Sequence, residues 1–166
     1  MNSALFFFSL FFIIFITACS NTAQVTIDRP IKDNAGNTFL VKDHVICEQE
    51  GKPIIREFAT SWCPHCAWIK PTYQQVVQEY GNKIIAHQWE ADIGDDLLSE
   101  QLELAVPQEE INLWKTFNPN QTIPTFVFGC KYIRIGNAFE EQKDREAEAR
   151  EFRAIIDKLL SGGEKP

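Results

Sequence analysis

The sequence predicts an α/β domain built around a mixed β-sheet, and two observations indicate it. Compact runs of apolar and β-branched residues alternate with stretches of helical periodicity in the order β-α-β, α, β-β-α. A strand–helix–strand unit brings two strands together in parallel, whereas a tight strand–strand connection makes an antiparallel pair. The chain is long enough for one domain with a substantial core. We therefore expect a central sheet with both kinds of pairing, flanked by helices.

The β-α-β unit occupies the first half of the domain. Residues 38–41 can form a short strand, and a Gly-Lys-Pro break precedes a compact strand at 54–59. A helix is expected from Pro64 to Tyr80, because proline suits the first helical turn and the following glycine is a common stop. Residues 83–89, KIIAHQW, are the expected second strand.

An acidic stretch follows, with seven acidic residues and no basic one between residues 92 and 110. Leu98, Leu102 and Ala105 recur at helical spacing, which predicts an acidic surface helix. The plain interpretation of these charges is a solvated helix face. A lid that selects substrates is the alternative.

The second half of the domain is expected to hold a helix, a hairpin and a last helix. The helix covers residues 108–117 and stops before Asn-Pro, and the hairpin strands cover residues 125–128 and 132–135. Asn137, with Glu140 three residues later, fits the cap of the last helix. Apolar residues then recur on one side of that helix until Gly162.

The N-terminus predicts export. Residues 4–18 are almost wholly apolar and hold six of the thirteen phenylalanines. This length is short for a membrane-spanning helix, which needs about 20 residues, but it suits a secretory signal. Ile16-Thr17-Ala18-Cys19 resembles a lipobox, whose cysteine is lipidated, although the preceding MNSA lacks Lys and Arg; an uncleaved anchor is the alternative. The expected organisation is a signal at 1–19, a tether at 20–37, the domain at 38–162 and a tail at 163–166.

Charge and cysteine content narrow the functional classes. All charged residues follow Cys19, so the net charge of −7 belongs to the exported part. An acidic domain without a Lys/Arg stripe argues against nucleic acid as a partner. Four cysteines remain after Cys19, and an even number in an exported chain favours disulfide chemistry over a metal site.

The most informative segment is EFATSWCPHCAWIKP at residues 57–71, in which Pro64 and His65 separate Cys63 from Cys66. Cys63 is expected at a helix N-terminus, where unpaired N–H groups and the macrodipole favour a thiolate, and His65 adds a donor or a positive charge. This predicts that Cys63 is the nucleophile and that Cys66 resolves the mixed disulfide. A structural staple is the alternative, but a ring across two residues is strained and constrains little of the unfolded chain.

With these elements in order, the chain resembles proteins of the thioredoxin fold over about residues 52–160. WCPHC at residues 62–66 is similar to the family's Trp-Cys-x-x-Cys site, and Pro-His is the dipeptide of DsbA-type oxidases. The other matching positions are Pro71 in the active-site helix, Glu57 at the buried acidic position, and Ile123-Pro124-Thr125 at the cis-proline turn. The resemblance implies a thioredoxin fold with a central mixed sheet of four to five strands. The segment before Ile123 is too short for the helical domain inserted in DsbA.

The resemblance also implies a role for Glu57. Burial makes a carboxylate costly and raises its pKa, so Glu57 is expected to accept the proton of Cys66 during the resolving step. The alternative is that Glu57 only pairs with a nearby cation such as Arg56 or Lys70.

A cis Pro124 would place the backbone of Ile123 and Thr125 beside the two sulfurs, where an extended substrate segment can pair with it. An ordinary trans turn proline is the alternative. Trp62 is expected on the rim of the site and Trp68 in the core.

In this fold the strands at 54–59 and 125–128 are antiparallel neighbours. Cys47 precedes the start of the first strand and Cys130 follows the end of the second, so both are expected at the pole opposite the active site. A structural disulfide between them is expected, and it would contribute about 4 kcal/mol in the chain-entropy model. Two free thiols, or an auxiliary redox relay, are the alternatives.

The functional hypothesis is an extracytoplasmic, membrane-tethered thiol–disulfide oxidoreductase that forms or isomerises disulfides in exported proteins. No cofactor is expected, and electrons are exchanged with a membrane-bound or soluble redox partner. Pro64 and His65 favour an oxidant, whereas Trp62 and Ile123 resemble reducing thioredoxins. A reductase resembling the TlpA/ResA lipoproteins is therefore the alternative. The non-enzymatic alternatives are a copper or zinc site on the Cys-x-His-Cys segment, although zinc wants four ligands, and a redox-inactive adhesion or chaperone domain.

Overall fold

The computed structural model describes residues 29–30 and 38–162. The predicted signal with its lipidation site Cys19, the predicted tail, and the predicted tether apart from residues 29–30 lie outside the described residues.

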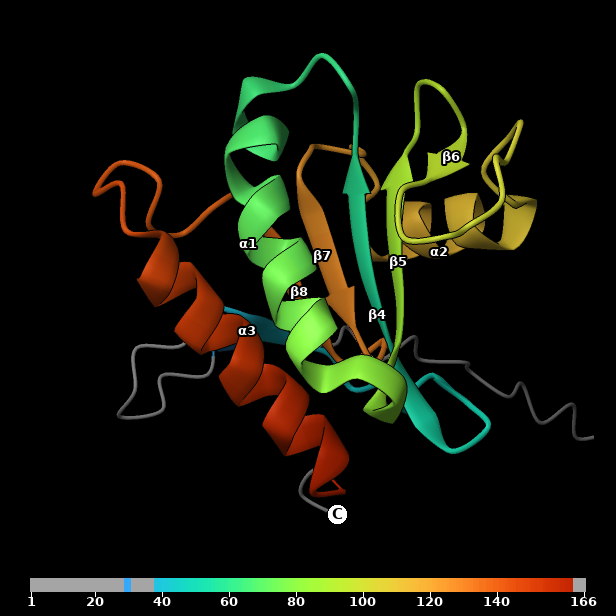
Figure 1. Cartoon of the computed structure of the whole chain (residues 1–166). Coiled ribbons are helices and arrows are strands. Elements are labelled where there is room, and N and C mark those ends of the chain that lie inside the picture. Colours follow the sequence, from blue (N-terminus) through green and yellow to red (C-terminus); the bar gives the residue numbers. More distant parts are fainter. Residues whose placement is uncertain (1–28, 31–37, 163–166) are drawn as a thin grey trace, which may run out of the picture.

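A mixed sheet forms the centre of the domain (Figure 1). Its four longer strands are β4 (Lys52–Ala59), β5 (Ile85–Glu90), β7 (Thr125–Phe128) and β8 (Tyr132–Ile135). β4 pairs in parallel with β5 and antiparallel with β7, which in turn pairs antiparallel with β8. The predicted α/β class with both kinds of strand pairing is confirmed.

Four two-residue strands extend this sheet beyond the expected four or five strands. β1 (Arg29–Pro30) pairs with β2 (Leu40–Val41), and β2 pairs with β8. β6 (Asp95–Asp96) pairs with β5, and β3 (Glu48–Gln49) pairs with the start of β4. β2 lies within the short strand expected at residues 38–41. The other three were not expected, because strands this short show no alternation of apolar and polar residues.

Three helices cover the sheet. α1 (Pro64–Tyr80) and α3 (Arg145–Leu160) lie side by side on one face, and α2 (Gln108–Phe117) lies on the other (Figure 1). A short 3-10 helix, η1 (Gly81–Lys83), follows α1. α1 and α2 have the bounds predicted from their terminal residues.

The sheet separates two apolar layers because successive side chains of a strand point to opposite faces. The buried side chains of the layer with α1 and α3 include Ile55, Tyr73, Phe126, Phe128 and Phe152. Those of the layer with α2 include Phe58, Trp89, Trp114, Phe117 and Val127. The rings of Phe58 and Trp114 stack with centroids 5.1 Å apart. These layers hold β4 rigidly, and β4 leads directly into the segment that carries Cys63.

The acidic surface helix predicted between residues 92 and 110 is wrong: turns, bends and β6 occupy residues 92–107, and residues 108–110 begin α2. Several carboxylates of this stretch bind backbone N–H groups. Asp96 Oδ1 accepts from the N–H of Gln88 at 2.8 Å, and Asp95 Oδ1 accepts from the N–H of Glu103 at 3.1 Å. Short acidic side chains that bond nearby backbone in this way compete with helix formation.

The predicted cap of the last helix is also wrong. α3 begins at Arg145, eight residues beyond Asn137, and Asp144 is its N-cap, with its Oδ1 accepting from Ala147 N–H at 2.8 Å. Asn137 and Glu140 lie in the β8–α3 loop, where they bond to each other and to His65.

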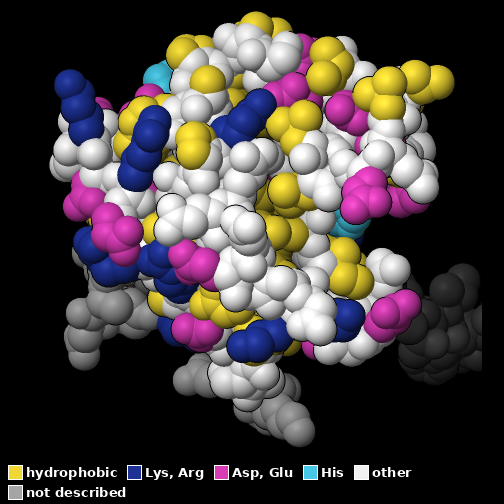
Figure 2. Space-filling view, in the orientation of Figure 1, with side chains coloured by type: hydrophobic (Ala, Val, Ile, Leu, Met, Phe, Trp, Pro, Cys, Tyr) yellow, Lys and Arg dark blue, Asp and Glu magenta, His cyan; other side chains and the backbone are white. Residues whose placement is uncertain are grey.

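The face formed by α1 and α3 shows Lys/Arg and Asp/Glu side chains interspersed, without a continuous basic stripe (Figure 2). None of the helices within residues 29–30 and 38–162 combines the length and the hydropathy needed to cross a bilayer.

Candidate active site

Cys63 is the N-cap of α1. Its backbone is extended, and its Sγ accepts a hydrogen bond from the backbone N–H of Cys66 at 3.3 Å. Pro64 occupies the first helical position, where its missing N–H leaves no hydrogen bond unmade. The N–H donor and the helix macrodipole both stabilise negative charge on this sulfur. The expected placement of Cys63 is therefore the observed one, and it suits a nucleophile.

Cys66 lies deeper than Cys63. The residue is 1 % exposed against 4 % for Cys63, and both are free thiols. Burial raises the pKa of the Cys66 thiol, and the hydrogen bond with Cys63 and the charge of Glu57 raise it further. A thiol in this environment remains protonated until a base removes its proton, as a resolving thiol requires.

Glu57 lies in β4 and is fully buried. Its Oε2 accepts from Gln88 Nε2 at 2.6 Å, while Oε1 has no hydrogen-bond partner among the described residues. Burial raises the pKa of Glu57 to about 7, although the Gln88 hydrogen bond opposes this effect. A carboxyl group with such a pKa can take and return a proton at neutral pH.

The two cations suggested as alternative partners of Glu57 bind other acids. Arg56 points to the opposite face of β4 and donates to both carboxylate oxygens of Glu110, at 2.6 and 2.8 Å. Lys70 donates to Glu90. Gln88, directly opposite Glu57 in the parallel register of β4 and β5, is the neighbour that the sequence did not suggest.

The peptide bond between Ile123 and Pro124 is cis. Ile123 packs against the small cluster of Ala59, Cys63 and Cys66, so this turn closes over the two thiols. Thr125 is fully buried in β7 between β4 and β8, and its hydroxyl donates to the carbonyl of Thr122. Its side chain is therefore not exposed to a substrate, and Ile123 is the residue that faces the cysteines. The expected pairing of the Thr125 backbone with a substrate segment stays a prediction.

His65 is exposed and held by the β8–α3 loop. Its Nδ1 lies 3.0 and 2.9 Å from the two carboxylate oxygens of Glu140. Asn137 Nδ2 donates to the His65 carbonyl at 2.9 Å and to Glu140 Oε2 at 2.8 Å. Burial alone would raise the pKa of Glu140, but the hydrogen bonds from Asn137 and His65 outweigh it and lower that pKa.

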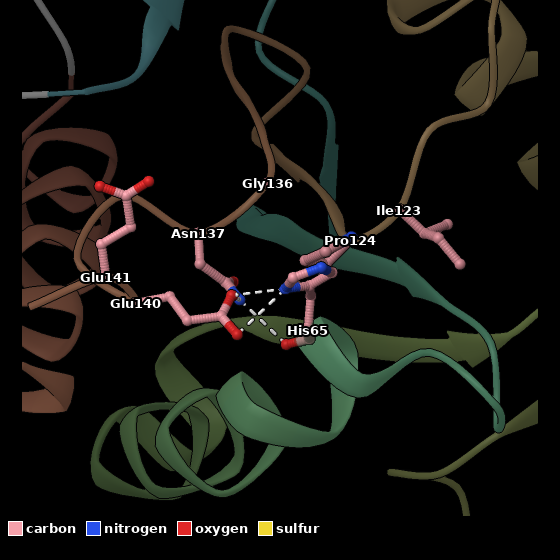
Figure 3. A pocket seen from close by; sticks show the side chains of 7 residues that line it. All are labelled: His65, Ile123, Pro124, Gly136, Asn137, Glu140 and Glu141. Atoms are coloured by element: carbon pink, nitrogen blue, oxygen red, sulfur yellow. Dashed lines mark hydrogen bonds and ion pairs between the residues drawn. The ribbon is translucent and has the colours of Figure 1, made fainter. Parts of the chain in front are cut away.

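These side chains line a pocket of about 500 Å³ between the cis-proline turn and the β8–α3 loop (Figure 3). The lining residues are His65, Ile123, Pro124, Gly136, Asn137, Glu140 and Glu141. Sequence reasoning missed Asn137 and Glu140 as site residues. The topology carried a signal for them: β7 starts at the cis-proline turn and β8 runs back antiparallel, so the segment after β8 returns to the active-site end.

Trp62, directly before Cys63, is 71 % exposed, and its place on the rim of the site stays a prediction. The preceding residue, Ser61, is tied to the β5–β6 turn, because its N–H and hydroxyl donate to Asp92 at 2.9 and 2.5 Å. Trp68 is half-buried against the apolar layer of α1 and α3, with the Arg145 guanidinium 5.4 Å from its ring centroid.

Cys47 and Cys130 form a disulfide whose Cα atoms are 5.3 Å apart across a sequence separation of 83. Cys130 lies in the turn between β7 and β8, and Cys47 N–H donates to the Gly129 carbonyl at 2.9 Å. The bridge lies at the end of the sheet opposite the start of α1, where the fold predicted it. Within the described residues, no group of three or more His, Cys, Asp or Glu side chains has the arrangement of a metal site.

A family model described as thioredoxin matches residues 40–115. Among solved structures, the oxidoreductase NmDsbA1 from N. meningitidis is similar, with a TM-score of 0.52 and 18 % sequence identity. The match covers 76 % of this chain and 94 % of that one, and at this identity it concerns the fold. A search of curated proteins finds no match.

The matched region includes β4, α1 and β5, and thus both free thiols and Glu57. The structure adds what the family model does not cover, namely the cis-proline turn and the hairpin of β7 and β8. It follows that this chain is a thiol–disulfide oxidoreductase with the thioredoxin fold.

Proposed function

We propose that this oxidoreductase acts outside the cytoplasm, attached to a membrane, and forms or isomerises disulfides in exported proteins. The observation that carries the proposal is the environment of Cys63, whose sulfur sits at a helix N-terminus and accepts the Cys66 N–H at 3.3 Å. This environment stabilises the reduced, thiolate form, and stabilising the reduced form makes the disulfide a stronger oxidant. The signal-like residues 1–19 and the lipobox-like Cys19 support export and attachment.

In the oxidising direction, a thiolate of the client attacks Cys63 Sγ of the Cys63–Cys66 disulfide. The client–Cys63 bond forms, the Cys63–Cys66 bond breaks, and Cys66 leaves and takes a proton from Glu57. A second client thiolate then attacks the client sulfur of the mixed disulfide, so the client disulfide forms and Cys63 leaves as a thiolate. The client loses two electrons and two protons, and a partner disulfide must later accept the two electrons from the cysteine pair.

Isomerisation begins with the opposite attack. The Cys63 thiolate attacks a client disulfide and forms the mixed disulfide, and a different client thiolate displaces Cys63. If no client thiolate arrives, Glu57 accepts the Cys66 proton and Cys66 attacks Cys63, which releases the client in reduced form. Ile123 and Pro124 lie beside the thiols and are the surface against which the client segment would pair.

The test is the reduction potential of the Cys63–Cys66 pair in glutathione buffers. A potential near about −120 mV would support an oxidase, and one near about −270 mV would overturn it in favour of a reductase. The reductase is the second candidate because Glu140 binds the imidazole of His65. Without this contact, His65 would be free to stabilise the Cys63 thiolate.

Client exchange is tested by trapping. Cys66→Ala leaves Cys63 able to attack but removes the resolving thiol, so mixed disulfides with exported proteins should accumulate. Cys63→Ala is the matched control and should trap none. If Cys66→Ala traps no exported protein in an exporting host, the proposed clients are wrong.

Membrane attachment is tested separately from catalysis. Cys19→Ser should prevent lipid addition and release the chain from the membrane fraction. Unchanged processing and attachment would exclude Cys19 as the anchor and leave an uncleaved N-terminal segment as the alternative.

A further inference from the structure

The β8–α3 loop places a carboxylate on the histidine between the two cysteines. Glu140 approaches His65 Nδ1 with both oxygens, at 3.0 and 2.9 Å, and Figure 3 shows the two side chains pointing toward each other. Asn137 fixes this arrangement, because its Nδ2 donates both to Glu140 and to the His65 carbonyl. The contact joins residues 75 positions apart.

This contact has an electrostatic consequence for the thiols. A positive imidazole near a thiolate stabilises the reduced form of the pair, whereas a carboxylate in the same place destabilises it. A protonated His65 paired with Glu140 has no net charge, so much of its attraction for negative charge on Cys63 is cancelled. The same hydrogen bonds direct the imidazole toward the loop.

We propose that Glu140 is a positioning residue that acts through His65 to lower the reduction potential of the Cys63–Cys66 pair. The inference rests on the proposed redox use of this pair and deepens it. It explains how one chain can combine an oxidase-like Pro64-His65 dipeptide with features of a reductant, because the loop moderates the effect of the dipeptide. The lowered pKa of Glu140 agrees, since it keeps this carboxylate charged.

Glu140→Gln removes one negative charge from the surroundings of the thiols and frees the imidazole that the carboxylate binds. Both changes favour a thiolate on Cys63. The other titratable groups near His65 are Cys63 on its own helix and Glu141 in the loop.

The experiment measures the equilibrium of the purified full chain with glutathione, in which two glutathione thiols reduce the Cys63–Cys66 disulfide and form oxidised glutathione. For Glu140→Gln we expect a shift toward the reduced protein of roughly tenfold, equivalent to about 30 mV. In a His65→Ala background, Glu140→Gln should shift the equilibrium clearly less, because the carboxylate can no longer act through the imidazole.

Glu141→Gln is the matched control, because it removes the same charge one residue away. Glu141 lines the same pocket, but no hydrogen bond or ion pair of the described residues joins it to His65, and its carboxylate points away in Figure 3. Its equilibrium should stay near that of the wild type. Asn137→Ala, which loosens Glu140 without removing its charge, should shift the equilibrium in the same direction as Glu140→Gln but less.

Three outcomes would overturn the inference: an equilibrium of Glu140→Gln equal to that of the wild type, a shift toward the oxidised protein, or an equal shift in Glu141→Gln. If Glu140→Gln fails to fold, Asn137→Ala decides alone, and an unchanged equilibrium rejects the proposal. A wild-type protein that does not exchange with glutathione at all would instead reject the redox function itself, so the two failures are distinguishable.

Discussion

The molecule carries two cysteine pairs at opposite ends of its sheet, and they differ in almost every respect. Cys63 and Cys66 are three positions apart, free, and placed where a helix begins. Cys47 and Cys130 are joined across a separation of 83 and lie where β4 starts and β7 ends. The first pair closes almost no loop, and the second closes a large one.

The difference shows that surroundings, and not the residue type, decide what a cysteine pair does. The Cys63–Cys66 pair has an N–H donor that stabilises a thiolate on one sulfur, and a buried carboxyl group nearby that can exchange a proton. Cys130 lies instead in the apolar layer with Phe58 and Trp114. A disulfide that joins distant segments in such a layer restricts the unfolded chain.

The largest expected effect is the loss of activity in Cys63→Ala. Removing the attacking sulfur should lower disulfide exchange with a client peptide by at least ~10³-fold, since the remaining groups cannot form the mixed disulfide. The free energy of unfolding of the reduced protein should change far less. Exchange measured with a fluorescent client peptide tests this, and substantial residual activity would show that a second thiol attacks.

The other pair should respond in the opposite way. Replacing both Cys47 and Cys130 with alanine should lower the free energy of unfolding by about 4 kcal/mol, because the unfolded chain regains the entropy of the large loop. Exchange by the protein that remains folded should be nearly unchanged. Denaturant unfolding and exchange assays on the same sample separate the two effects. A change in the potential of Cys63 and Cys66 would contradict the separation of the pairs.

Glu57→Gln tests the buried carboxyl group that only one pair possesses. Below about pH 4.5 this group is protonated in both folded and unfolded chains, so it does not affect stability. Between pH 4.5 and about 7 the unfolded chain releases the proton while the folded chain retains it, and the wild type loses stability as pH rises. Above that range the loss reaches about 3 kcal/mol. Glu57→Gln should therefore be more stable than the wild type near pH 8 and equal to it below pH 4.5.

The same substitution should slow the resolving step roughly 10²-fold at neutral pH, because Cys66 loses its proton acceptor. Accumulation of the mixed disulfide in quenched reactions measures this. Glu79 is the control for stability: hydrogen bonds from Arg153 and Gln75 lower its pKa to about 2 at an exposed position, so Glu79→Gln should destabilise slightly. A stability of Glu57→Gln that falls with rising pH as in the wild type would show that Glu57 does not titrate as proposed.

Much of the fold could be predicted because its signals are local. Pro64 and Gly81 mark the ends of α1, and the hairpin of β7 and β8 is visible in two short β-branched and aromatic runs. The disulfide of Cys47 and Cys130 followed once the fold placed two strand ends together. These inferences needed residue identity and topology but no side-chain contact between distant segments.

The parts that sequence reasoning missed depend on such contacts. The sequence does not show whether an acidic residue in a polar stretch faces water or binds a distant group. In the structure, Asp96 accepts a hydrogen bond from the N–H of Gln88, and Glu140 binds the imidazole of His65. The spacing of Asn137 and Glu140 fits a helix cap equally well, so only the course of the chain after β8 could assign them to the active site.

The smallest expected effect concerns the rim of the active pair. Asp92 fixes the turn before Trp62 by accepting from both the N–H and the hydroxyl of Ser61. Asp92→Ala should lower exchange with a client peptide a few-fold, since the exposed indole is held less firmly, while the reduction potential stays unchanged. Asp92→Asn, which keeps one acceptor oxygen, should lie between the wild type and Asp92→Ala. If Asp92→Ala instead shifted the reduction potential as much as Glu140→Gln, Asp92 would act electrostatically on the Cys63–Cys66 pair. The surroundings that distinguish this pair from Cys47 and Cys130 would then include the β5–β6 turn.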